Sequence, residues 1–329
     1  MLDFSVILAP WGRQPPDVPE VVAVAKDAEA MGFYSIGIPH VPLMPYADER
    51  PPYGGYPAFI PPHFRHFEYD PLVVLPILGN ATTRLKVGFN VLVTPWLHPF
   101  VWARYLASLD AATNGRVVAG FGLSEPSPNG LVKALDNFGI EGRTRGSRAD
   151  EALDLMTRLW VTDSPVTYRG HFYTGIELAL DPKPTRKPYV ELWWAGVSDR
   201  SIVRAAKYAR FLELAFPTAT SVREHFVPRL GQENATWNGH AGLAAVVFSN
   251  VTSVDVDQKT VWRRYHIGES PEGFAVGTPG QCADVLGRLA TAGVDHFVLD
   301  FNRHGQDSVT EYRHHMEAFA AHVVPLLAS

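Results

Sequence analysis

His40 and the turn at residues 120–122 stand where a side chain or a backbone segment could meet a bound molecule. His40 directly follows an apolar run, and an imidazole with a pKa near neutrality could move a proton or stabilise a developing oxyanion. A histidine bonded only to nearby backbone would satisfy the same pattern. Gly120 and Gly122 end another apolar run, and they allow close approach of the backbone to a neighbour.

A second candidate is the junction formed by Gly196, Val197 and Ser198, which leads from an apolar run into a helical pattern. Backbone amides and a hydroxyl at the start of a helix suit a cofactor phosphate, to which Arg200 and Arg204 could add charge. The same serine could act only as the helix cap, so the two interpretations stand together.

The elements that must position these residues alternate between short apolar strands and helices. Strands are predicted at 4–9, 33–38, 85–93, 117–121, 190–195, 211–216, 243–250 and 296–301. Helices are predicted at 18–31, 72–80, 100–112, 143–160, 198–208, 278–292 and 309–327, with a hairpin at 166–173. Eight buried strands alternating with helices favour a closed (β/α)8 barrel in the α/β class. A doubly wound open sheet is the competitor, weakened because no GxGxxG pattern follows the first strand.

Composition narrows the function classes. The net charge of −5 argues against nucleic-acid binding, and no apolar run reaches membrane-spanning length. The single cysteine, Cys282, excludes internal disulfides and fits a reducing compartment, so a cytoplasmic location is expected. No metal site is expected, because no carboxylate pattern completes a site at His63 and His66, and His314-His315 lies in the last predicted helix on the outside of the barrel. The stretch 41–69 is rich in aromatic residues and is predicted to be an ordered lid or rim loop.

Eight segments in the right order give the chain a resemblance to a known family. They include LDAATNGRVVAGFG at 109–122 and FGIEGRTRGSRADEALDLMTRLW at 138–160. The others lie at 23–40, 69–88, 98–99, 172–196, 276–286 and 292–301. Together they resemble the bacterial luciferase-like monooxygenase family of flavin- and deazaflavin-dependent oxidoreductases. The resemblance implies one TIM-barrel domain over residues 1–329, with insertions after strands two, four and seven.

The resemblance also implies roles for individual residues. Asn90-Val91 matches the place where relatives often have a non-prolyl cis peptide bond under the flavin ring. Glu125 matches an acid of deazaflavin-dependent relatives and would pair with His40 across the barrel mouth. Relatives often have an acidic residue before this histidine, where the present chain has Pro39. Segment 208–215 also departs from the family pattern, so the residues that bind the cofactor or the substrate are expected to differ from those of relatives.

The function implied is oxidation of a small organic substrate with reduced FMN and O2, under the 41–69 loop. The alternative is hydride transfer with the deazaflavin coenzyme F-420 (F420), in which His40 and Glu125 handle protons. A non-catalytic barrel subunit is the second alternative. The family implies a reductase that supplies reduced cofactor, and a homodimer or higher homo-oligomer. Gly122, Gly196, Val197 and Ser198 would bind the cofactor together with the Asn90-Val91 pair.

Overall fold

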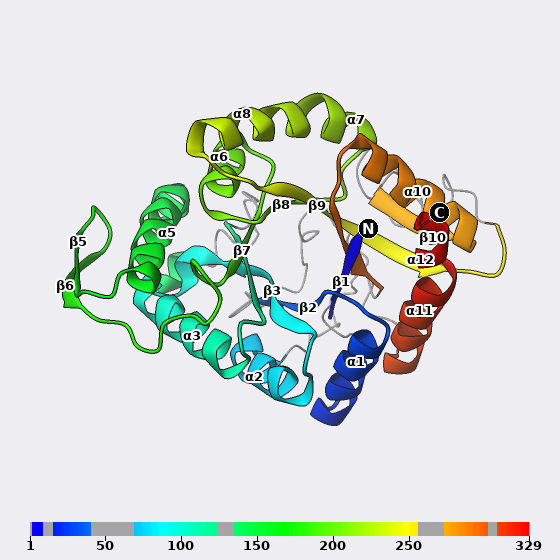
Figure 1. Cartoon of the computed structure of the whole chain (residues 1–329), viewed down its shortest axis with the longest axis horizontal. Coiled ribbons are helices and arrows are strands. Elements are labelled where there is room, and N and C mark those ends of the chain that lie inside the picture. The colour runs from blue at the N-terminus through cyan, green and yellow to red at the C-terminus, as the bar shows by residue number, and fades with distance from the viewer. Residues whose placement is uncertain are drawn as a thin grey trace.

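Eight parallel strands close into a ring, and helices surround it (Figure 1). The computed structural model describes residues 2–8, 16–40, 69–123, 135–255, 273–301 and 308–328. The ring strands are, in order, β1 (Asp3–Ile7), β2 (Ser35–His40), β3 (Lys86–Val93), β4 (Val117–Gly122), β7 (Glu191–Ala195), β8 (Phe211–Ala215), β9 (Gly242–Val251) and β11 (His296–Asp300). β8 pairs with β9 and β11 pairs with β1, which closes the ring. The predicted TIM barrel is therefore confirmed, and an open sheet is excluded.

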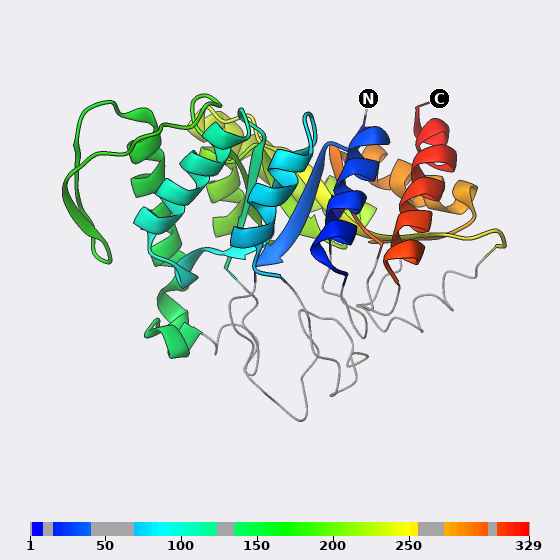
Figure 2. The ribbon, with the colours of Figure 1, turned by 90° about the horizontal axis from the view of Figure 1, so that it is seen from below.

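The outer layer consists of helices, most of which begin at a side-chain cap. They are α1 (Val18–Ala30), α2 (Pro71–Ala81), α3 (Pro99–Ala112), α5 (Arg145–Val161), α6 (Asp199–Tyr208), α8 (Val227–Trp237), α10 (Pro279–Ala292) and α11 (Val309–His322). Asp17, Thr278 and Ser308 each form a capping box at the start of α1, α10 and α11. Figure 2 shows α1, in blue, beside α11, in red, on the outside of the sheet.

The remaining elements decorate the barrel. They are β5 (Val166–Arg169), β6 (Thr174–Leu178), β10 (Phe274–Gly277), α7 (Ala219–Ser221), α12 (Val324–Leu327), three 3-10 turns, η2 (Thr94–Trp96), η3 (Leu135–Phe138) and η4 (Gly142–Thr144), and a π-helical turn, η5 (Val222–Phe226). β5 and β6 form the predicted hairpin, which projects from one side of the molecule (Figure 1). β10 pairs with the end of β9.

Two elements differ from the sequence-based expectation. The pattern of residues 217–241 predicts no helix, yet α7, η5 and α8 form one continuous helical segment there. The π-turn breaks the 3.6-residue period and Pro228 lies inside the segment, so periodicity does not reveal it. β10 is likewise unpredicted, because four residues carry too little pattern. Residues 41–68, 124–134 and 256–272, which hold the predicted lid and most of the predicted insertions, lie outside the described residues.

Alternation along the strands divides the apolar residues into two layers. Leu212 and Leu214 of β8 face the helices and belong to the large outer core. Trp193, Phe211 and Val298 point into the ring, where they form a separate apolar layer with Ile7, Val118, Ala244 and Val246. The ring is therefore packed with side chains at mid-height and holds no open pore.

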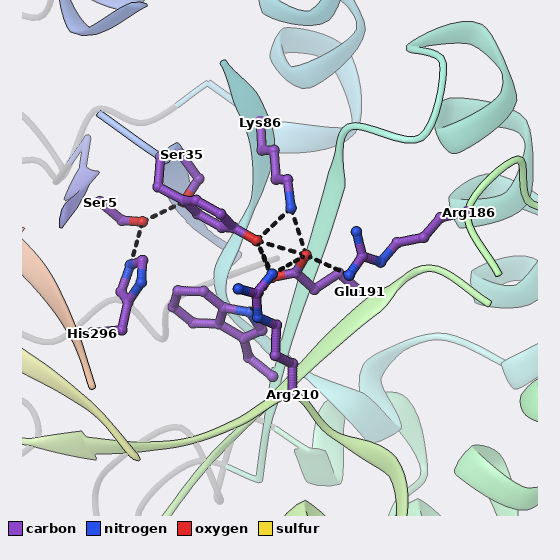
Figure 3. Close-up of polar contacts among 9 residues, drawn as sticks. Ser5, Ser35, Lys86, Arg186, Glu191, Arg210 and His296 are labelled. Atoms are coloured by element: carbon purple, nitrogen blue, oxygen red, sulfur yellow. Dashed lines mark hydrogen bonds and ion pairs between the residues drawn. The ribbon is translucent and has the colours of Figure 1, made fainter. Parts of the chain in front are cut away.

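Below that layer, the N-terminal ends of the strands enclose a buried carboxylate, Glu191 (Figure 3). Its side chain has no exposed surface and lies 2.6 Å from Lys86 Nζ. It accepts hydrogen bonds from Tyr34 at 2.7 and 2.8 Å and from Trp193 at 2.9 Å. Arg186 and Arg210 each approach it at 3.3 Å. Burial acts to raise the pKa of Glu191, but Lys86 and these hydrogen bonds outweigh it and lower that pKa below its ordinary value.

A second polar chain lies beside this cluster. Ser35 donates to Ser5 at 2.7 Å, and Ser5 lies 2.7 Å from Nε2 of His296 (Figure 3). Since Ser5 accepts from Ser35, it has its own proton free to donate to His296, which is fully buried. Burial lowers the pKa of His296 to about 3, so the ring is neutral at physiological pH.

We expect Glu191→Ala to destabilise the barrel by about 3–5 kcal/mol, because it leaves three cations without their shared buried carboxylate. Urea unfolding followed by circular dichroism measures this. Glu141→Ala is the control, since the Glu141–Arg143 pair is largely exposed and its loss should leave the unfolding midpoint unchanged. Equal midpoints for the two variants would contradict the assigned role of Glu191.

Candidate functional site

At the opposite, C-terminal end of the ring, three neighbouring strands present small apolar residues. A Cβ added to Gly122 of β4 would lie 3.1 Å from Val91 Cγ2 of β3 and 3.8 Å from Ala195 Cβ of β7. Val91 and Ala195 are partly exposed, so the group faces open space. We call Val91, Gly122 and Ala195 the platform. It has the size and apolar character to support one face of a flat ring, and any larger side chain at position 122 would fill it.

The platform begins at an irregularity in β3. The peptide bond between Asn90 and Val91 is cis, as the resemblance implies, and the pairing of β3 with β4 shifts register between Phe89 and Leu92. Gly37 of β2 lies against this point, since a Cβ there would be only 2.7 Å from Asn90 Cβ. Glycine at position 37 is therefore what leaves room for the Asn90 side chain inside the ring.

From this position Asn90 reaches across the barrel. Its Nδ2 donates to Oε2 of Glu213 on β8 at 2.5 Å. Glu213 is 4% exposed, and burial raises its pKa to about 7, against the smaller lowering effect of the Asn90 hydrogen bond. An interior carboxyl beneath the barrel mouth is a marked functional candidate.

Sequence reasoning missed Glu213, although a signal was present. The strand FLELA carries one charged residue in an otherwise apolar run, at an inward-facing position of the alternation. The departure of segment 208–215 from the family pattern also falls on this strand. A single charged residue in a buried strand suggests a functional role, because burying an unpaired carboxylate costs free energy of folding.

His40 is the last residue of β2, and its ring lies away from the platform. The ring is 3% exposed and packs edge-on against Phe89, Trp96 and Trp102, with centroids 6.0, 6.1 and 5.3 Å away. Its Nδ1 has no hydrogen-bond partner among the described residues. Burial lowers the pKa of His40, so the imidazole is neutral at physiological pH. Its predicted partner, Glu125, lies outside the described residues.

The predicted phosphate site forms the junction of β7 and α6. Ser198 caps α6, accepting from the backbone N of Ser201 at 3.2 Å. Gly196 has φ +150°, and a Cβ there would lie 2.5 Å from Ser201 Oγ, so glycine is needed. Arg204 is 3% exposed and bound to Asp150 at 2.5 Å, so its charge is already compensated. The helix-cap interpretation is confirmed, while the phosphate role stays a prediction.

The structure thus unites some of the predicted residues and separates others. Asn90, Val91 and Gly122 meet directly, and Gly196 follows Ala195 of the platform along β7. No hydrogen bond or ring contact within the described residues joins His40 to any of them. A Cβ at Gly122 would fill the platform, and the start of α6 follows Gly196 beside it. These residues fit a tricyclic ring that carries a phosphate tail.

The family model for luciferase-like monooxygenases matches residues 4–271. The chain belongs to the luciferase-like monooxygenase family. Its fold, its cis bond in β3 and its small-residue mouth are consistent with this membership.

Two curated relatives and one solved structure illustrate the range of the family. The chain is 30% identical over 192 residues, 56% of its length, to the uncharacterized protein Rv0940c of Mycobacterium tuberculosis, and the match spans 62% of that relative. It is 26% identical over 308 residues, covering 79% of each chain, to an FMNH(2)-dependent dimethylsulfone monooxygenase of Pseudomonas putida. An F420-dependent secondary alcohol dehydrogenase, solved with an F420-acetone adduct, has the same fold at TM-score 0.73 and 17% identity, with 99% of both chains covered.

No helix within the described residues combines the length and the apolar character needed to cross a membrane.

The buried carboxyl predicts a pH-dependent stability. Because the folded-state pKa of Glu213 is raised from 4.5 to about 7, folding binds a proton between these values. Stability is then lost as pH rises from about 4.5 through 7, by about 3 kcal/mol for a fully buried group. Glu213→Gln removes this titration, so its stability relative to wild type should rise from pH 5 to pH 8 in urea unfolding. A difference that is the same at both pH values would contradict the raised pKa.

Proposed function

We propose that this protein is a reduced-FMN-dependent monooxygenase that acts on a small organic substrate. The observation that carries the proposal is the match over 79% of the chain to an FMNH(2)-dependent monooxygenase, together with the platform at the barrel mouth. When bound, reduced FMN supplies the electrons and the oxygen-activating centre. The proposal treats residues 1–329 as one barrel domain.

In this proposal the chain's residues bind and orient. Val91, Gly122 and Ala195 would support the ring face, since small side chains let the ring approach the strands closely. The backbone around Gly196 and Val197, with the Ser198 cap, would face the phosphate, where the start of α6 contributes a favourable partial charge. The apolar character of the platform excludes water from that face of the ring.

The alternative is F420-dependent hydride transfer. It is supported by family members that use F420 and by Glu125, whose sequence position matches an acid of deazaflavin-dependent relatives. The two cofactors share a tricyclic ring, so the platform fits both. A non-catalytic barrel subunit is the third outcome of the same experiment.

We expect the purified protein to bind FMN and to oxidise a candidate substrate when a flavin reductase with NAD(P)H supplies reduced FMN, with product formation as the measurement because free reduced FMN consumes O2 by itself. Titration of the protein with FMN and with F420, followed by fluorescence, distinguishes the cofactors. Gly122→Val should weaken binding of the true cofactor at least tenfold, because the added side chain occupies the platform. Tight binding of F420 alone would favour hydride transfer, and binding of neither cofactor would favour the non-catalytic subunit.

The proton-handling role of His40 stays a prediction: its ring lies away from the platform among Phe89, Trp96 and Trp102, and proton transfer would require its Nδ1, unpartnered among the described residues, to reach the substrate. We expect His40→Ala to lower kcat by about 10²-fold or more, the usual contribution of a general acid or base. His314→Ala on the outer helix α11 should leave kcat unchanged. An active His40→Ala variant with wild-type kcat would show that the ring only fills its aromatic pocket.

The proposal includes the partners that such chemistry requires. A separate reductase would supply the reduced cofactor, and a homodimer or larger homo-oligomer is expected from the family. Cys282 is free and fully buried, which is compatible with a cytoplasmic location.

A further inference from the structure

Glu213 is tied to the platform through a single side chain. Asn90, the residue before Val91, donates its Nδ2 hydrogen bond to Glu213 Oε2 at 2.5 Å from the far side of the ring. Glu213 pairs with Ala195 in the ladder between β7 and β8, so it lies at the level of the platform. Glu213 therefore contacts the platform region twice. Its carboxyl binds Asn90, which precedes Val91, and its backbone pairs with Ala195.

Asn90 also borders a small space on the inner side of the ring. A small cavity inside the ring is lined by Asn90, Gly37 and Gly88, and further toward the floor by Ser5, Ser35 and Trp193. Asn90 thus lies between this cavity and the mouth. Gly37 leaves room for the Asn90 side chain, and the hydrogen bond to Glu213 holds its amide in that position.

Most charged groups of the barrel interior lie away from Glu213, and the exception at the same end of the ring is Asp300, which is buried at the end of β11. Glu191, Lys86, Arg210 and His296 lie at the strand starts, and Trp193 and Phe211 of the apolar layer separate them from Glu213. The neighbours of Glu213 on β7 and β9 are Ala195 and Ala244, neither of which titrates. Burial and the Asn90 hydrogen bond are the influences on its pKa, and no charged side chain of the described residues contributes.

We propose that Glu213 is a positioning residue of the cofactor site, which fixes Asn90 beneath the platform and exchanges a proton with solvent when a ring binds above it. A ring seated on the platform covers the little exposed surface that Glu213 retains and excludes water above it, which favours the protonated form of the carboxyl. Cofactor binding and proton uptake are then linked, and each must affect the other equally. This part of the inference rests on the proposed function, whereas the hold of Glu213 on Asn90 does not.

The experiment compares wild type, Glu213→Gln, Glu213→Leu and Asp110→Asn. Glutamine keeps an acceptor for Asn90 and loses the proton, and leucine loses both. Asp110 is the matched control, since it is another fully buried carboxyl with a raised pKa due to burial, but it accepts from the backbone N of Arg186 outside the site. FMN affinity is measured by fluorescence titration at about pH 6 and about pH 8.5, on either side of the Glu213 pKa.

From the lower to the higher pH, wild type and Asp110→Asn should lose about three- to tenfold more FMN affinity than Glu213→Gln, because the second ionisation of the FMN phosphate at about pH 6 affects every variant alike. Glu213→Leu should bind more weakly than wild type at every pH, by about the strength of one hydrogen bond, or three- to tenfold. A pH-dependent affinity in Glu213→Gln that matches wild type would overturn the proton linkage. Wild-type affinity in Glu213→Leu would overturn the positioning role.

A measurement without cofactor separates this inference from the proposed function. The side-chain amide signals of Asn90, assigned through an Asn90→Ala spectrum of ¹⁵N-asparagine-labelled protein, should shift with pH around 7 in wild type and in Asp110→Asn. They should not shift in Glu213→Gln. Absence of FMN binding in every variant would contradict only the proposed function. An Asn90 amide signal that does not shift with pH in wild type would contradict the inference about Glu213.

Discussion

The buried carboxylate of Glu191 is the interaction on which the closed ring depends. It lies at the start of β7 and binds groups from the starts of other strands, namely Lys86 of β3 and Arg210 just before β8. Removal of a charge from water is costly, and this site compensates it with three cations and hydrogen bonds from Tyr34 and Trp193. Strands far apart in the sequence are thereby held at one end, so the other end needs no large side chains for closure.

The C-terminal mouth of the barrel accordingly carries small residues. Gly37 leaves room for the Asn90 side chain. Gly122 has no side chain that would cover Val91 and Ala195, so the platform stays open. The result is a barrel with a charged floor, an apolar middle layer and a mouth of small residues above the buried carboxyl of Glu213. In TIM barrels function resides at the C-terminal ends of the strands, and the division seen here follows that rule.

The strand pattern was strong enough in the sequence to predict the ring and all eight of its strands, because each is a short apolar run and most are followed by a clear helix signal. The cis bond at Asn90-Val91 followed from the family resemblance. Other features depend on contacts between distant segments. The outward pocket of His40 is made by Phe89, Trp96 and Trp102, and no local pattern shows which way a strand-end ring turns. The commitment of Arg204 to Asp150 and of Asn90 to Glu213 likewise exists only once the ring has closed.

The most direct test of this account is a crystal structure of the protein soaked or co-crystallised with FMN. The account predicts the tricyclic ring at the C-terminal mouth, with one face in contact with Val91, Gly122 and Ala195 and the phosphate near Ser198. Glu213 should remain bonded to Asn90 below the ring. A ring bound elsewhere on the barrel, or a phosphate far from the β7–α6 junction, would contradict it.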